Sequence, residues 1–304
     1  MLTTMPYRIR YDRLPTEQPN PRTHDLDRLP LPALLRRVHQ EDRRAILAVG
    51  RALPQVARAI RVIVEALRGG GRLVFIGAGT SGRLGVLEAA ECPPTFHTPP
   101  SLVQALQAGG RGAVFRSREG AEDDRGAARR AVRRRLRGGD VAVGVTASGV
   151  TPFVDAALRA ARSRGAATIL LTCHPRAVIP ADVTIAVPVG PEVLSGSTRL
   201  KAGTATKLVL NLLTLGTMVR LGKTYGHLMV DVRPTSRKLR ARSVRLVQSL
   251  TGHPPRAAAA ALRAARGRVK VATVMVRRRA GYAAAVRRLR HVDGSLRRAL
   301  EGAG

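Results

Sequence analysis

Short, wholly apolar segments that run directly into loops rich in glycine and hydroxyl side chains constrain the fold of this chain most strongly. Segment 73–76 (LVFI) is apolar at every position and is followed by GAGTSGR at 77–83. The same order recurs at 141–145 (VAVGV), which leads into TASGVTP at 146–152. Uninterrupted apolar runs are typical of strands buried on both faces, as in parallel sheets. We therefore expect each pair to form a buried strand, a tight turn and the start of a helix.

Further segments extend this pattern into an α/β fold. Helical periodicity follows both loops, to about Glu91 after the first and over 153–162 after the second. Three more buried strands are expected, at 102–106, 168–172 and 183–187. The helix after the first of these is expected to contain Glu122. Alternating strands and helices predict a parallel sheet with helices on both faces, a three-layer αβα sandwich.

Helical segments precede and follow this region. Residues 34–67 have helical spacing with a break at Pro54, and glycines at 69–71 end the pattern. After Lys201, helices are expected over 202–221 and 236–250, and an Ala/Arg-rich remainder follows the GHPP break at 252–255. The predicted organisation is therefore an N-terminal arm that docks on an unspecified surface (1–30), an α/β domain (31–235) and a small C-terminal helical domain (236–304).

The charge of the chain raises the question of a nucleic-acid partner. Its 304 residues include 53 Lys+Arg and 20 Asp+Glu, which gives a formal net charge of +33. Because 44% of the residues are hydrophobic, a chain that is disordered over its whole length is excluded. The surplus is mostly arginine spread along the chain, aromatic residues are only 3%, and no nucleic-acid-binding motif is evident. We predict a solvated basic surface that binds polyanions non-specifically at low salt, and no specific nucleic-acid partner.

The cysteines and apolar segments indicate the compartment. Cys92 and Cys173 have neither the number for a disulfide framework nor a metal-ligand spacing. Residues 1–13 carry charges where a signal peptide needs an apolar stretch, and segment 208–219 is too short to span a bilayer. We predict a soluble, cytoplasmic protein with no membrane partner.

The two hydroxyl-rich loops are candidate phosphate sites. In open parallel sheets, ligands bind where the carboxyl ends of strands meet helix N-termini, whose free N–H groups and dipole favour anions. The first loop fits the letters G-x-G-x-x-G, but no acidic residue ends a second strand at the expected distance and no Walker lysine follows, so a nucleotide site is unsupported. We expect a monophosphate, held by residues from both loops: Thr80, Ser81, Ser148, Gly149 and Thr151.

A third hydroxyl-rich segment, SGSTRLK at 195–201, opens the long helix. Its hydroxyl groups are either helix N-caps or further donors to a ligand. In the second interpretation, Ser195 and Ser197 donate hydrogen bonds, while Lys201 adds positive potential toward an anion.

Two carboxylates stand out because acids are scarce. Glu91 lies at the end of a predicted helix, where the dipole disfavours a negative charge, so it is a candidate for chemistry. Glu122 belongs to an acidic cluster at 119–124 (EGAEDD), some of whose members are expected only to complement a helix N-terminus. Cys92 is expected to be a packed thiol.

Set side by side, these segments closely resemble the N-acetylmuramic acid 6-phosphate etherases of the sugar isomerase (SIS) superfamily. The resemblance begins at Thr16-Glu17-x-x-Asn20-x-x-Thr23 and covers nearly the whole chain. Its strongest blocks are GAGTSGRLGVLEAAECPPTF at 77–96, EGAED at 119–123, SGSTRLKAGTATKLVLN at 195–211 and residues 222–234.

The resemblance implies cleavage of the D-lactyl ether of the sugar phosphate, giving N-acetylglucosamine 6-phosphate and D-lactate in the recycling of cell-wall amino sugars. The family reaction is an elimination followed by addition of water and needs no metal or other cofactor. Family members are homodimers with active sites near the subunit interface. By this resemblance Glu91 protonates the leaving lactate, Glu122 assists the proton transfers, and the residue that takes the C2 proton is left open.

The resemblance also assigns binding residues and shows departures. It implies that Ser148 and Thr151 hold the phosphate and that Thr80 and Ser81 contact sugar or phosphate. Five positions differ from the usual family residues: Val150 (usually Arg), Phe153 (Tyr), Pro191 (Ala), His227 (Asn) and Ser236 (Asn). Val150, Phe153, His227 and Ser236 bear on substrate affinity, and Val150 and His227 also bear on which sugar is bound.

Two alternative functions are carried alongside the etherase. The first is a non-catalytic regulator that binds a hexose phosphate, as related SIS proteins do; retention of Glu91 and Glu122 argues against it. The second is a nucleic-acid-binding protein, which predicts sequence preference well above non-specific affinity.

Overall fold

A computed structural model of the chain describes residues 11–176, 178–232 and 237–302. The chain forms two compact units, residues 1–89 with 102–213 and residues 90–101 with 214–304. The boundaries fall inside two helices, α3 (Gly79–Phe96) and α7 (Lys201–Arg220). Ser236 and the first ten residues of the predicted arm lie outside the described residues.

The first unit contains a five-stranded sheet in which every neighbouring pair of strands is parallel. The strands are β1 (Leu73–Gly77), β2 (Val103–Gln107), β3 (Val141–Thr146), β4 (Ala167–Thr172) and β5 (Val183–Ala186), in the order β2-β1-β3-β4-β5. All five lie within two residues of the predicted segments, so the predicted α/β fold with a parallel sheet is confirmed.

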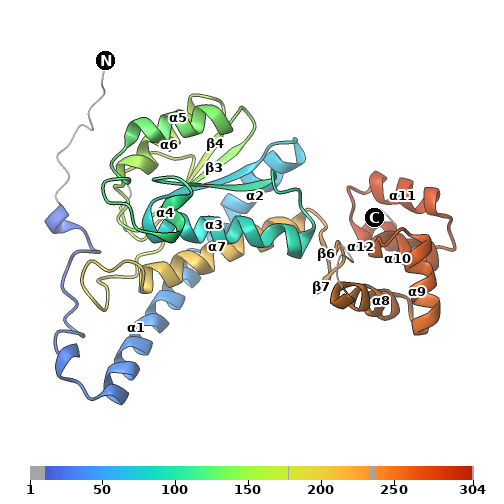
Figure 1. The fold of residues 1–304 in the computed structure, drawn as a ribbon, viewed down its shortest axis with the longest axis horizontal. Helices are drawn as coiled ribbons and strands as arrows, with labels where there is room; N and C mark the ends of the chain where they lie inside the picture. The colour runs from blue at the N-terminus through green and yellow to red at the C-terminus, as the bar shows by residue number, and fades with distance from the viewer. Residues whose placement is uncertain (1–10, 177, 233–236, 303–304) are drawn as a thin grey trace. The chain divides into compact units, whose positions relative to one another are not determined.

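Helices cover both faces of this sheet. Figure 1 shows α5 (Arg125–Arg135) and α6 (Pro152–Arg162) over one face and α3 and α7 over the other. Val74 and Ile76 of β1 belong to the core cluster formed with α5 and α6. Phe75, between them, points the other way, since a methyl group built on Gly85 of α3 would lie 2.8 Å from its Cβ. Side chains alternate along a strand, so a wholly apolar strand buries both of its faces.

The chain before the sheet consists of short 3₁₀ turns and two long helices. The turns are Tyr11–Arg13 and Leu26–Arg28, and the helices are α1 (Leu31–Arg51) and α2 (Leu53–Arg68). Pro54 lies in the first turn of α2, where its missing N–H costs nothing, so the predicted break is confirmed.

Two predictions around the candidate carboxylates were wrong. Glu122 lies in a turn and not in a helix, because the Asp124 carboxylate accepts a hydrogen bond from the Ala127 N–H at 2.7 Å and starts α5 at Arg125. Helix α3 does not end near Glu91 but continues to Phe96, through two prolines, and His97 then adopts a left-handed backbone with φ 53°. A short helix that was not predicted, α4 (Gly112–Phe115), also follows β2.

The second unit is mainly helical, as expected for the C-terminal part of the chain. It holds a two-stranded ribbon, β6 (Thr224–Tyr225) with β7 (Leu228–Met229), and helices α8 (Arg237–Thr251), α9 (Pro255–Ala264), α10 (Val269–Arg277), α11 (Tyr282–His291) and α12 (Leu296–Glu301). Apolar residues of α8 to α12, with Val230, form a core of their own.

Helix α7 is long and apolar enough to cross a membrane by length and composition alone. Half of its most apolar stretch is buried within the protein, and Val209, Leu210 and Leu213 have no exposed surface. Such burial is typical of a core helix in a soluble protein.

Candidate active site

The strand order locates the crevice in which a ligand is expected. In the order β2-β1-β3-β4-β5 the direction of winding changes between β1 and β3, and ligands of open α/β sheets bind outside the carboxyl ends of strands at such a point. Gly77, the last residue of β1, pairs in register with Val145 of β3. The two predicted loops, 77–82 and 146–151, therefore follow neighbouring strands on both sides of this switch point.

The first loop is a tight turn between β1 and α3. A methyl group on Gly82 would lie 2.5 Å from the carbonyl oxygen of Gly77, so only glycine permits this approach. Thr80 and Ser81 lie half-buried in the first turn of α3, where backbone N–H groups have no partner within the helix. Gln107, at the end of β2, also faces this turn and donates a long hydrogen bond of 3.5 Å to the Gly79 carbonyl. Free N–H groups at the N-terminus of a helix favour an anion.

The second loop is organised by the hydroxyl group of Thr146. Its Oγ1 lies 2.7 Å from Oγ1 of Thr151 and 3.3 Å from Oγ of Ser148, and it accepts a hydrogen bond from the Gly149 N–H at 3.2 Å. Gly149 has φ 75°, and a methyl group there would lie 3.0 Å from Oγ1 of Thr172 on the next strand. The predicted binding residues Ser148, Gly149 and Thr151 thus share one hydrogen-bonded network.

The turn that carries Glu122 is attached to the second loop. The Phe153 N–H, two residues after Thr151, donates a hydrogen bond of 2.8 Å to the Glu122 carbonyl. The side chain of Glu122 lies at the surface of the chain, yet partial desolvation raises the pKa of its carboxyl group, and the nearby charges of Asp123 and Glu119 raise it further. A carboxyl group with a raised pKa is suited to hold and transfer a proton.

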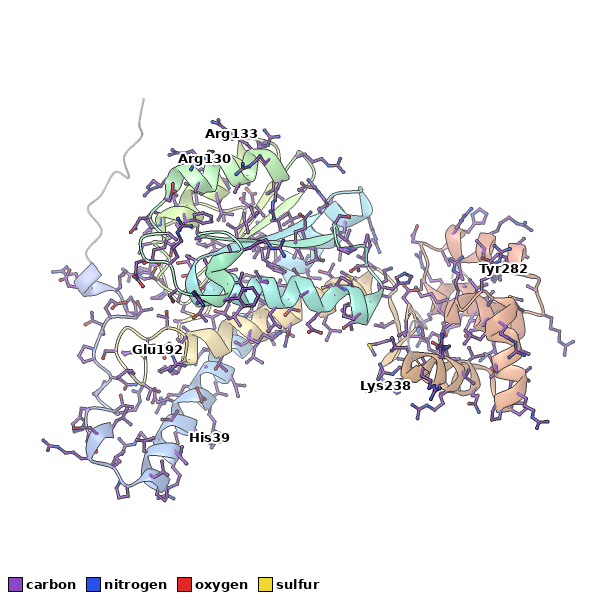
Figure 2. All side chains as sticks on the ribbon, viewed as in Figure 1. His39, Arg130, Arg133, Glu192, Lys238 and Tyr282 are labelled. Carbon is purple, nitrogen blue, oxygen red and sulfur yellow. The ribbon has the colours of Figure 1, made fainter. Side chains whose placement is uncertain are left out.

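The third predicted segment leads into α7 and lies close to the first loop. A methyl group on Gly203 would lie 3.7 Å from Cγ2 of Thr80, so the first turns of α7 and α3 are neighbours. Ser195 is exposed and Ser197 half-buried. Figure 2 shows Glu192 at the amino-terminal end of α7, where its buried carboxylate accepts hydrogen bonds from two backbone N–H groups, at 3.0 and 2.9 Å. Glu192 caps the helix, which leaves Ser195 and Ser197 free of that role.

Lys201 has a different environment from the other predicted binding residues. Its side chain has no exposed surface, and its ammonium group donates a hydrogen bond of 2.7 Å to Oε2 of Glu41, a buried carboxylate of α1. Glu41 also accepts hydrogen bonds from Arg22 and Asn20. This geometry favours a structural role for Lys201; binding of substrate by Lys201 stays a prediction.

The first unit therefore gathers the residues of the two loops, Glu122 and the start of α7 at one edge of the sheet. Glu91 belongs to the second compact unit, where it is exposed on α3. In the described part of the chain, no cluster of three or more His, Cys, Asp or Glu side chains has the arrangement of a metal site.

The positions that depart from the family pattern lie in several environments. Val150 is 6% exposed within the second loop, and Phe153 is 2% exposed in the core formed with α5 and α6. Pro191 presents its carbonyl group to Asn20 of the arm, and His227 is exposed in the turn between β6 and β7. Ser236 lies outside the described residues.

Several residues that build the site were missed from the sequence. Thr146 and Gln107 are the last residues of β3 and β2, and this position identifies them as candidates once the strand ends are known. Glu41 and Glu192 lie far from the glycine-rich loops in sequence, and no local pattern distinguishes them from surface acids.

One family model and one solved structure are similar to parts of this chain. The sequence model of the glucokinase regulatory protein N-terminal SIS domain matches residues 55–162. A solved phosphoheptose isomerase from Neisseria gonorrhoeae is 22% identical and covers 60% of this chain and 99% of its own, with a TM-score of 0.47.

Full-length relatives are closer. An N-acetylmuramic acid 6-phosphate etherase of Gloeobacter violaceus is 57% identical over 266 residues, which cover 86% of this chain and 87% of the relative. The etherase of Geobacillus thermodenitrificans is 47% identical over 293 residues, 95% of this chain and 99% of the relative. That of Synechocystis is 47% identical over 304 residues, 98% of this chain and all of the relative. With identity this high over nearly the whole length of both chains, the protein belongs to the N-acetylmuramic acid 6-phosphate etherase family.

Proposed function

We propose that this protein cleaves the D-lactyl ether of N-acetylmuramic acid 6-phosphate, giving N-acetylglucosamine 6-phosphate and D-lactate during recycling of cell-wall amino sugars. The observation that carries the proposal is the pair of hydroxyl-rich loops on both sides of the β1/β3 switch point, with the Glu122 turn hydrogen-bonded beside the second. This arrangement supplies an anion site and a proton-transfer group at one edge of the sheet.

The chemistry is an elimination followed by a hydration. Ring opening places the C2 proton beside the C1 aldehyde, which makes it acidic. A base takes this proton, the C3–O bond to lactate breaks, and Glu91 gives a proton to the leaving oxygen. Water then adds its oxygen to C3 of the C2–C3 double bond, and a proton returns to C2. The raised pKa of Glu122 supports a part for this residue in the proton transfers.

Substrate binding is proposed for the hydroxyl-bearing loops. Ser148, Gly149 and Thr151 hold the phosphate through hydroxyl and backbone N–H groups, and Thr80 and Ser81 contact the sugar or the phosphate at the α3 N-terminus. Further donors are proposed from the segment that leads into α7, Ser195 and Ser197, and Lys201 at the start of α7 is the cation predicted from the same segment.

We also propose a cytoplasmic homodimer. Leu31, Leu35 and Ile46 of α1 are 67%, 57% and 55% exposed, and their spacing places them along one side of the helix. Exposed apolar stripes of this kind mark interfaces, and a second copy of the chain is the occupant that family membership suggests. Sedimentation of Leu35→Glu against wild type tests the proposal: persistence of the dimer would exclude this face as the interface.

The deciding experiment is incubation of purified protein with N-acetylmuramic acid 6-phosphate in H₂¹⁸O, with free lactate and label in the sugar as readouts. Elimination and hydration place ¹⁸O at C3 of the product. Release of lactate without label in the sugar would exclude this mechanism.

Substitutions of the two candidate carboxylates, each paired with a control substitution of another glutamate, test whether Glu91 and Glu122 are catalytic. Glu91→Gln and Glu122→Gln are each expected to lower the rate of lactate release by about 10²–10⁴, the usual value of general acid–base catalysis. Glu65→Gln, at another exposed glutamate on a long helix, and Glu119→Gln, in the same turn as Glu122, serve as controls that keep most of the rate. Full activity of either test variant would remove that residue from the mechanism.

A regulator that binds a sugar phosphate without turnover is the second candidate function. It is favoured by the match of residues 55–162 to the glucokinase regulatory protein domain. Tight binding of a hexose 6-phosphate by calorimetry, with no lactate formed from the muramic acid substrate, would establish this function in place of the etherase.

A further inference from the structure

The segment before α1 carries the motif Thr16-Glu17-x-x-Asn20-x-x-Thr23, to which the reaction assigns no part. Thr16, Asn20 and Thr23 are only 3%, 4% and 7% exposed, although they are polar residues in an irregular segment. Burial of polar groups is costly unless they form hydrogen bonds, so the partners of these residues indicate what the segment does.

All three residues bind the stretch of chain that leads into the Ser195–Ser197 loop. The Gly196 N–H donates a hydrogen bond of 3.1 Å to the Thr16 carbonyl. The Asn20 amide donates to the Pro191 carbonyl at 3.3 Å, and the Thr23 hydroxyl donates to the Val193 carbonyl at 2.9 Å. Three separate links therefore join residues 16–23 to residues 191–196.

Asn20 also connects these links to the buried charges beneath the loop. The same amide nitrogen donates to Oε2 of Glu41 at 3.0 Å, and this oxygen accepts a hydrogen bond of 2.7 Å from Lys201, the first residue of α7. Glu192 lies between Pro191 and Val193 in the sequence. Its carboxylate accepts hydrogen bonds from the backbone N–H groups at the start of α7. The loop is thus held at both ends, by the arm and by the helix.

We infer that residues 16–23 form a positioning clamp for the Ser195–Ser197 loop, and that Asn20 and Thr23 set the affinity for the sugar phosphate by holding this loop at the substrate edge of the sheet. The inference rests on the proposed function. Asn20 and Thr23 act as positioning residues because they donate hydrogen bonds to the carbonyl groups of Pro191 and Val193, which precede the loop, and not to the reacting atoms.

Substitutions of Thr23 test the clamp with little change in volume. Thr23→Val removes the hydroxyl donor and leaves the Val193 carbonyl without it, whereas Thr23→Ser keeps the donor. Thr168→Val is the matched control: Thr168 is fully buried, and its hydroxyl donates a hydrogen bond to Asp182 at 2.7 Å, at the opposite end of the strands.

The clamp predicts an increase in KM of about 5- to 20-fold for Thr23→Val with N-acetylmuramic acid 6-phosphate, with kcat within about twofold of wild type. Thr23→Ser and Thr168→Val are expected to retain the wild-type KM. The amide hydrogen of Gly196 is expected to exchange faster in Thr23→Val than in Thr168→Val. Asn20→Ser provides the same two readouts if Thr23→Val does not fold.

The outcomes separate this inference from the proposed function. Lactate release by wild type with an unchanged KM in Thr23→Val and Asn20→Ser would overturn the clamp and leave the etherase standing. If wild type released no lactate, the clamp would be decided by Gly196 exchange and by calorimetric binding of N-acetylglucosamine 6-phosphate. Unchanged exchange in both variants overturns the clamp, as does a KM that rises equally in Thr168→Val.

Discussion

The ion pair between Glu41 and Lys201 permits a quantitative prediction of stability. The two side chains are 2% and 0% exposed, and their nitrogen and oxygen atoms are 2.7 Å apart. Burial alone would raise the pKa of Glu41, but hydrogen bonds from Arg22, Lys201 and Asn20 outweigh this effect and lower it from 4.5 to about 2. Each pKa unit corresponds to about 1.4 kcal/mol, so the charged form of Glu41 contributes about 3 kcal/mol to folding.

The direction of the pH dependence follows from this lowered pKa. A group whose pKa is lower in the folded protein stabilises it fully above the pKa of the unfolded chain. The contribution of Glu41 is therefore complete above about pH 4.5 and decreases as the pH falls toward about 2. Glu41→Gln leaves the Lys201 ammonium group buried without its counter-ion, and loss of one partner of a buried pair costs about 3–5 kcal/mol at neutral pH.

Urea unfolding followed by far-UV circular dichroism, for wild type, Glu41→Gln, Lys201→Met and the double variant, measures this effect. The double variant is expected to be more stable than the sum of the two single changes indicates, because it leaves no unpaired buried charge. The difference between wild type and Glu41→Gln is expected to shrink as the pH falls below 4.5. A loss below about 1 kcal/mol in Glu41→Gln at neutral pH, or a difference independent of pH, would refute the reasoning.

Two further predictions concern the loops of the site. Replacing Glu119 by Gln and Asp123 by Asn removes charges that raise the pKa of Glu122, so the limb of the pH–rate profile assigned to Glu122 is expected to move to lower pH; a limb that stays in place would separate Glu122 from that titration. Gly82→Ala is expected to destabilise the protein by about 1–3 kcal/mol in thermal unfolding and to lower lactate release, because the new methyl group would lie 2.5 Å from a backbone carbonyl oxygen. Gly112→Ala, with no atom within 4 Å of the new methyl group, is the control, and equal losses in both variants would contradict the steric argument.

The sheet, and the edge at which its two hydroxyl-rich loops lie, were predictable from the sequence because their determinants are local. The run at 73–76 is apolar at every position and ends in glycine, so both its burial and the turn after it are visible in a few residues. The second loop carries the same signals, and its hydroxyl groups do form one network around Thr146. The apolar runs and the glycine- and hydroxyl-rich loops that follow them therefore indicate which strand ends lie at this edge of the sheet.

What the sequence did not reveal depends on contacts between distant segments. The prediction of a helix at Glu122 was wrong because Asp124 acts as the N-cap. A run of acidic residues does not by itself indicate which of its members caps the helix. Lys201 was predicted to face a ligand because it follows a hydroxyl-rich segment, yet its partner, Glu41, lies 160 residues away. Pairings of this kind are fixed by tertiary packing and have no local signature.

The acidic cluster at 119–124 has an unusual electrostatic environment, because the chain as a whole has a large surplus of basic residues. Each of the five buried carboxylates of the described chain has a cation or backbone N–H groups as partner: Glu41, Glu88, Asp140, Asp155 and Glu192. Hydrogen bonds from cationic side chains lower the pKa of Glu41 and Asp140, whereas burial raises the pKa of Glu192. Around Glu122 the near neighbours are instead Glu119 and Asp123, which raise its pKa. In a protein with a net charge of +33, this local excess of acid favours the protonated form of Glu122, while Asp124 of the same cluster caps α5.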